Sequence, residues 1–122
     1  MHRVTLRVGI DSSQAFQFER DVVVTGIAMH CSGENSTAGY IEGWLQMGYR
    51  TGTIQPPDMP ESLTLASLLL GSGSSAGMNG ANMWFADSFP IYAGEYVTLA
   101  ALNRSAVVSD FTLKCTIYFE EV

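Results

Sequence analysis

The side chains best suited to nucleophilic chemistry are a histidine and a cysteine that are adjacent in the sequence, His30 and Cys31. An imidazole can activate a thiol by taking its proton when the two side chains lie within hydrogen-bond reach. The β-branched run that contains this pair predicts a strand, and successive residues of a strand point to opposite faces. The two side chains should therefore diverge, and we expect no Cys/His nucleophile.

Two pairs of closely spaced carboxylates have the residue types for acid–base chemistry or cation binding: Glu19 with Asp21, and Glu120 with Glu121. Both pairs lie at the ends of predicted strands, where solvated charges discourage aggregation between sheets. A metal site of the cupin type needs three histidines and a glutamate, whereas the chain has two histidines. We therefore expect no enzyme activity, no metal and no cofactor.

Aromatic and basic side chains on the polar faces of predicted strands are the stronger signal. If the aliphatic residues of the last two strands face the core, Tyr96 and Tyr118 point outward. Such rings, apolar in body and polar at the tip, are enriched in protein interfaces. Two arginines on the polar face of the first strand are suited to acidic groups of a partner. The predicted partner interface consists of Arg3, Arg7, Tyr40, Trp44, Trp84, Tyr96 and Tyr118.

These side chains must be positioned by strands, because apolar and polar residues alternate with a period of two through most of the chain. The alternation is clearest in residues 111–119 and recurs in 4–10, 22–31 and 95–102. About eight such segments, separated by turn-forming residues, predict an all-β antiparallel sandwich or barrel. We expect one domain, residues 1–122, in which residues 1–13 are either the first strand or a partner-dependent N-terminal strand or arm.

One segment carries the signals of a short helix, between about residues 58 and 71. Asp58 is suited to cap the helix, Pro60 falls in its first turn, and Glu61 completes a capping box. Leucines follow at helical spacings. The Gly- and Ser-rich residues 71–80 come next, and they lack the strand, lysine and helix of a phosphate-binding loop. We expect a flexible loop that is either a mobile tip or a segment ordered by a partner.

Charge and composition restrict the partners and the compartment. The chain has 122 residues, with six Lys and Arg against twelve Asp and Glu, which leaves a net charge of −6. It therefore lacks the basic surface expected for binding nucleic acid or an anionic membrane. The sequence has no long apolar stretch and no secretory signal, so we expect synthesis in the cytoplasm.

The two cysteines, Cys31 and Cys115, are too few for a disulfide scaffold. If the strand ending at Cys31 pairs with the last strand so that Val23 lies opposite Phe119, the two cysteines are about four residues, or roughly 13 Å, apart. A disulfide requires Cα atoms within about 7 Å of each other. We therefore expect free thiols.

The order of these features resembles that of the compact jelly-roll proteins of virions. The features are the β-branched segment 22–27, a loop-rich middle with one helix, the segment 90–99 and a last alternating strand. The chain is most similar to the decoration or cement proteins of tailed bacteriophage heads and, more loosely, to the jelly-roll heads of phage fibres. The resemblance spans nearly the whole chain. It implies an antiparallel jelly-roll sandwich and carries over no individual functional residue.

The resemblance implies a structural virion protein that is made in the host cytoplasm and decorates the capsid exterior. Such a protein is a homo-oligomer, a trimer rather than a dimer, that bridges neighbouring copies of the major capsid protein. A charged fraction of only 15% fits extensive burial by partners. The alternative is a glycan- or receptor-binding module of a phage fibre, in which the exposed aromatic rings stack on sugars.

Overall fold

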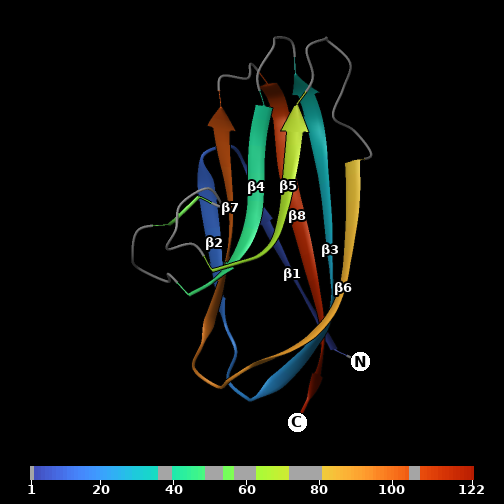
Figure 1. Ribbon diagram of the computed structural model, residues 1–122. Coiled ribbons are helices and arrows are strands. Elements are labelled where there is room, and N and C mark those ends of the chain that lie inside the picture. Colours follow the sequence, from blue (N-terminus) through green and yellow to red (C-terminus); the bar gives the residue numbers. More distant parts are fainter. Residues whose placement is uncertain (1, 36–39, 49–53, 57–62, 72–80, 105–107) are drawn as a thin grey trace.

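Two antiparallel sheets of four strands face each other in the computed structural model of the chain (Figure 1). The structure describes residues 2–35, 40–48, 54–56, 63–71, 81–104 and 108–122. The strands are β1 (His2–Val8), β2 (Ser12–Gln17), β3 (Val22–Asn35), β4 (Tyr40–Met47), β5 (Thr64–Gly71), β6 (Ala81–Ile91), β7 (Tyr96–Arg104) and β8 (Val108–Glu121). The predicted all-β antiparallel sandwich of eight strands is confirmed.

The strand order brings the two ends of the chain into one sheet. That sheet has the order β1-β8-β3-β6, and the other has the order β2-β7-β4-β5. The N-terminal strand β1 pairs with β8 without a break, from His2 opposite Phe119 to Val8 opposite Leu113. Within the single chain, β1 is therefore the edge strand of its own sheet.

The core lies between the sheets and is built from every second residue of most strands. On β8, for example, the inward residues Leu113, Cys115 and Ile117 are fully buried. Burying a side chain of this size contributes about 1.5–3 kcal/mol relative to leaving it in water. The largest fully buried aliphatic residues on the other strands are Val24, Ile27, Met29, Ile41, Leu45, Ile91, Val97 and Leu99.

The helix predicted between about residues 58 and 71 is wrong over its described part. Residues Thr64–Gly71 form strand β5, which pairs antiparallel with β4. Ala66 and Leu68 turn inward and are buried, whereas Ser67 is exposed. The spacing of these apolar residues fits a strand as well as a helix, and pairing with β4 decides between them. The capping residues of the predicted helix and the Gly- and Ser-rich residues 72–80 lie outside the described residues.

The described ranges, taken together, contain no helix with the length and apolarity needed to cross a membrane.

An irregularity in β3 changes which residues face the core. Val22 and Val24 are buried on the inner side, and the register shifts between Val24 and Gly26 against both neighbouring strands. The inner positions then resume at Ile27. An extra residue of this kind is a β-bulge, which reverses the alternation of the strand beyond it. Gly26 consequently lies on the outer side of the sheet.

Gly43 of β4 lies directly against Leu113 of the facing sheet, and this contact gives a stability prediction. A Cβ atom at Gly43 would lie 2.6 Å from Cδ2 of Leu113. We expect Gly43→Ala to lower the free energy of unfolding by about 1–3 kcal/mol, because the added methyl overpacks the core. Urea unfolding measures this. Gly9→Ala is the control, since its nearest atoms are 3.9 Å away, and equal stabilities of the two variants would contradict the packing described.

Candidate binding face

The residues considered for nucleophilic chemistry do not form a site. Cys31 and Cys115 are free and buried, and burial raises the pKa of Cys31 to about 11 and that of Cys115 to about 12. His30 is half-buried and neighbours Cys31 on β3, where consecutive side chains point to opposite faces. Thiols that keep their protons in an apolar core are inert.

The predicted pairing of β3 with β8 is wrong by one residue at Val23 and by two at Cys31. Val23 lies opposite Glu120 rather than Phe119, and Cys31 lies opposite Leu113 rather than Phe111. Cys115 lies opposite Met29, so the two cysteines are offset by two residues on neighbouring strands. The bulge in β3 accounts for part of this difference, because it adds a residue between the two ends of the pairing.

The paired carboxylates take part in hydrogen bonds and an ion pair at the end of the sandwich where β2 connects to β3 and β8 ends; this is the lower end in Figure 1. The Asp21 carboxylate accepts a hydrogen bond from the backbone N–H of Ala93 at 2.8 Å. Glu121 forms an exposed ion pair with Arg20, with 3.4 Å between Nη1 and Oε2. In the part of the chain that the structure describes, no three His, Cys, Asp or Glu side chains are grouped so that they could hold a metal ion.

Four of the seven predicted interface residues lie on the outer face of the β1-β8-β3-β6 sheet. Arg3 on β1 lies opposite Tyr118 on β8, and the rings of Tyr118 and Trp84 have centroids 5.5 Å apart. Arg7 lies opposite Lys114. We call this surface the aromatic–basic face. Its residues are Arg3, Thr5, Arg7, Gly26, Ala28, His30, Trp84, Lys114, Thr116, Tyr118 and, two residues beyond Tyr118 on the same side of β8, Glu120.

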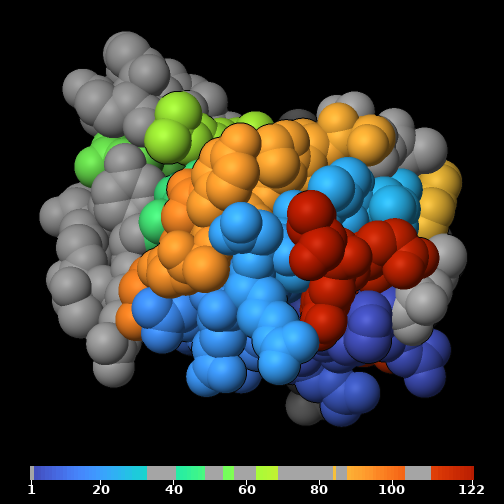
Figure 2. Space-filling model, turned by 90° about the horizontal axis from the view of Figure 1, so that it is seen from below, coloured from blue at the N-terminus to red at the C-terminus, as the bar shows by residue number. Residues whose placement is uncertain are grey.

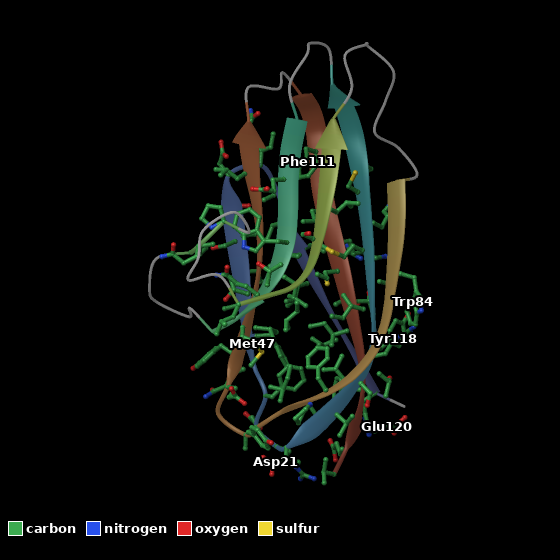
Figure 3. The ribbon with its side chains drawn as sticks, in the orientation of Figure 1. Asp21, Met47, Trp84, Phe111, Tyr118 and Glu120 are labelled. Carbon is green, nitrogen blue, oxygen red and sulfur yellow. The ribbon has the colours of Figure 1, made fainter. Side chains whose placement is uncertain are left out.

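Trp84 is the most prominent side chain of the aromatic–basic face. It is 59% exposed and projects from β6 beside Tyr118 (Figure 3). The six-membered part of its ring lies over Gly26, where a Cβ atom would come within 2.4 Å of Cη2. Only glycine at this position allows the ring to lie against the sheet. The bulge in β3 and the glycine that follows it therefore position Trp84.

The basic side chains of this face form no ion pair with any residue that the structure describes. Arg3 and Arg7 are exposed and Lys114 is half-buried. In the part of the chain that the structure describes, Arg20 forms an ion pair with Glu121, whereas Arg3, Arg7 and Lys114 form none. Three cationic groups and the one carboxylate of Glu120 give this face two unbalanced positive charges in a chain with a net charge of −6, which marks a local positive surface. Such a surface is suited to an anionic partner.

The remaining predicted interface residues do not join this face. The prediction that Trp44 is exposed is wrong: it is 2% exposed, and its Nε1 donates a 2.8 Å hydrogen bond to Oε1 of Gln46. Ile54 and Pro56 line the same hollow as Trp44, on the other sheet. Tyr96 is half-buried on β7 of that sheet, and the side chain of Tyr40 lies outside the described residues.

Several residues of the aromatic–basic face were missed by the sequence analysis. Lys114 and Thr116 share the parity of Tyr118, so alternation alone indicates their outward position. Thr5 joins them from β1, and its hydroxyl lies 3.0 Å from that of Thr116. Gly26 had no such signal, because its outward position depends on the bulge.

Comparison with known proteins does not identify a family. No protein-family model matches the chain, and no curated protein matches it. One similar solved structure is described as "Bacillus endospore appendages form a novel family of disulfide-linked pili". The two chains are 12% identical, and the match covers 95% of this chain and 87% of that one with a TM-score of 0.31. A likeness of this size carries no argument about function.

The positive potential around Trp84 can be measured by fluorescence quenching. At low ionic strength, iodide should quench Trp84 about twofold more than caesium does, after each ion is normalised to free N-acetyltryptophanamide. Trp44 is buried and should not respond to either ion. In the double variant Arg3→Gln/Lys114→Gln the normalised difference should disappear. Equal normalised quenching of the unaltered protein by the two ions would show that the face is not positive.

Thiol labelling checks the burial of Cys31 and Cys115. The folded protein should react with a thiol reagent at pH 8 orders of magnitude more slowly than the unfolded chain, in which two thiols titrate. Below pH 9 the thiols should not make stability depend on pH. Above pH 9 the free energy of unfolding should fall, because unfolded thiols ionise near 9.0 whereas folded Cys31 keeps its proton to about 11. Rapid labelling of the folded protein would contradict the burial.

Proposed function

We propose that this chain is a non-catalytic structural virion protein that decorates the exterior of a phage capsid and makes its protein contacts through the aromatic–basic face. The observation that carries the proposal is the convergence of Arg3, Arg7, Trp84 and Tyr118 on one sheet face. Buried aromatic and arginine side chains supply most of the binding energy in protein interfaces. An acidic protein surface is the partner that this face fits.

The strand order supports the jelly-roll part of the proposal. In a jelly roll, eight antiparallel strands form two facing sheets through two Greek keys. The orders β1-β8-β3-β6 and β2-β7-β4-β5 pair the first strand with the last and the second with the seventh, as that topology requires. Proteins of many functions share this architecture, so the face and not the fold carries the functional argument.

Protection of a sheet edge is the competing explanation for the arginines. Charged residues on an edge strand such as β1 prevent edge-to-edge association. Arg3 and Arg7 fit that role, but Lys114 does not, because β8 lies between β1 and β3. Edge protection also leaves the exposed ring of Trp84 unexplained. A binding face accounts for all four residues.

Co-sedimentation with capsids purified without the protein tests the proposed function. Trp84→Ala and the double variant Arg3→Gln/Lys114→Gln should each lower the apparent affinity by about tenfold or more, which corresponds to the roughly 1.4 kcal/mol or more expected at a central interface residue. The control Ser13→Glu/Ser67→Glu lowers the net charge by the same two units, because it adds two carboxylates at exposed positions on the other sheet. It should bind as the unaltered protein does.

Two other outcomes would overturn the proposal. Binding of the face variants at full occupancy would show that another surface attaches the protein. A protein that ignores capsids but whose Trp84 fluorescence is quenched by an oligosaccharide would instead be a glycan-binding module. The exposed ring of Trp84 and the side chain of Thr5, which is exposed on the same sheet face, are the features that such a module would use.

A further inference from the structure

We infer that the acidic partner of the aromatic–basic face is the lower end of a second copy of the same chain. This inference rests on the proposed function, because it names the protein surface that the same face binds. We call the second surface the acidic end. It comprises the β2–β3 connection, the β6–β7 turn and the last residues of β8, with the charged residues Glu19, Arg20, Asp21, Glu95 and Glu121.

Opposite charges are concentrated on the two surfaces. The acidic end carries four carboxylates and one guanidinium, which leaves three unbalanced negative charges. The aromatic–basic face carries the three cations of Arg3, Arg7 and Lys114 and the one carboxylate of Glu120, which leaves two unbalanced positive charges. Complementary potentials of this kind guide encounter and set the orientation of binding.

The acidic end is held rigid by hydrogen bonds among its segments. Figure 2 shows these segments side by side, with residues 17–21 in blue, 92–96 in orange and the C-terminal residues in red. Gly94 N–H donates to the carbonyl of Phe18 at 2.7 Å, and Val122 N–H donates to the carbonyl of Asp21 at 3.2 Å. The Glu95 carboxylate accepts from Tyr92 N–H at 2.7 Å. A surface already ordered loses little entropy when it binds.

The acidic end also offers an apolar side chain to match Trp84. Tyr92 is 59% exposed in the β6–β7 turn, where the backbone N–H groups of Tyr92 and Ala93 donate to the carboxylates of Glu95 and Asp21. Aromatic pairs contribute about 0.5–1.5 kcal/mol beyond their buried area. The two surfaces therefore complement each other in chemical type as well as in charge.

Charge decides which pairs of surfaces associate. Face against face brings two net positive surfaces together, and end against end brings carboxylates together, so both of these contacts are repulsive. Face against end is attractive. When each copy gives its face to one neighbour and its end to another, the contact is heterologous and builds rings or open chains. The trimer favoured by the sequence analysis is the smallest ring of this kind.

The size of the face sets the strength of one contact. Four strands about 4.8 Å apart and seven residues of about 3.3 Å each give roughly 440 Å² of flat sheet. Standard stable interfaces bury about 800 Å² per partner. A single contact should therefore be weak in solution, and the high local concentration on a capsid would strengthen it.

A mixing experiment tests the inference directly. The face variant is Arg3→Gln/Lys114→Gln, and the end variant is Glu19→Lys/Glu121→Lys. Sedimentation velocity at high protein concentration and low salt, about 20 mM, should show association of the unaltered protein, which about 500 mM salt weakens. Each variant alone should sediment as a monomer. Because the end variant keeps its face and the face variant keeps its end, their mixture should form a one-to-one dimer.

The other outcomes separate this inference from the proposed function. A mixture that stays monomeric, while the unaltered protein associates, would place the contact elsewhere and overturn the inference. If no protein associates in solution or at the concentration reached on capsids, but the face variant still loses capsid binding, the inference is wrong and the proposed function stands. If the face variant keeps both its association and its capsid binding, both are wrong. Ser13→Glu/Ser67→Glu, whose net charge equals that of the face variant, should associate as the unaltered protein does.

Discussion

The pairing of β3 with β8 is the interaction on which the rest of the structure depends. Both strands have fourteen residues and lie in the centre of their sheet, flanked by β1 and β6. The inner residues of β8 fill the core against the other sheet, and Leu113 meets Gly43 there. The outer residues of the same strand, Lys114 and Tyr118, belong to the aromatic–basic face. One alternating strand thus supplies both the stability of the sandwich and its candidate binding surface.

A single extra residue in β3 positions part of the aromatic–basic face. Without the bulge between Val24 and Gly26, strict alternation would turn Gly26 toward the core together with Val22 and Val24. With the bulge, Gly26 faces outward and leaves room for the ring of Trp84. The Thr25 hydroxyl donates a 3.3 Å hydrogen bond to the carbonyl of Tyr118, which fixes the irregular stretch against β8. A local backbone feature of β3 therefore brings together side chains from β6 and β8.

Alternation carried most of the information that the sequence offered about this fold. It predicted the sandwich and the outward positions of Arg3, Arg7 and Tyr118, because a period of two assigns each residue of a strand to a face. It was misleading at Trp44, since a ring on the outer face of a sheet can still be buried; Trp44 is 2% exposed, and Ile54 and Pro56 line the same hollow. It could not separate a helix from a strand in residues 64–71, where pairing with β4 is a long-range contact. The bulge was equally invisible, because it depends on register with two neighbouring strands.

The aromatic–basic face should be covered when the protein binds its partner. Hydroxyl-radical footprinting of Trp84 tests this most directly. Trp84 is 59% exposed in the single chain, so it should oxidise rapidly in dilute protein. On decorated capsids its oxidation rate, measured by mass spectrometry, should fall several-fold, while the buried Trp44 remains unreactive in both states. An unchanged oxidation rate of Trp84 on fully decorated capsids would contradict the account.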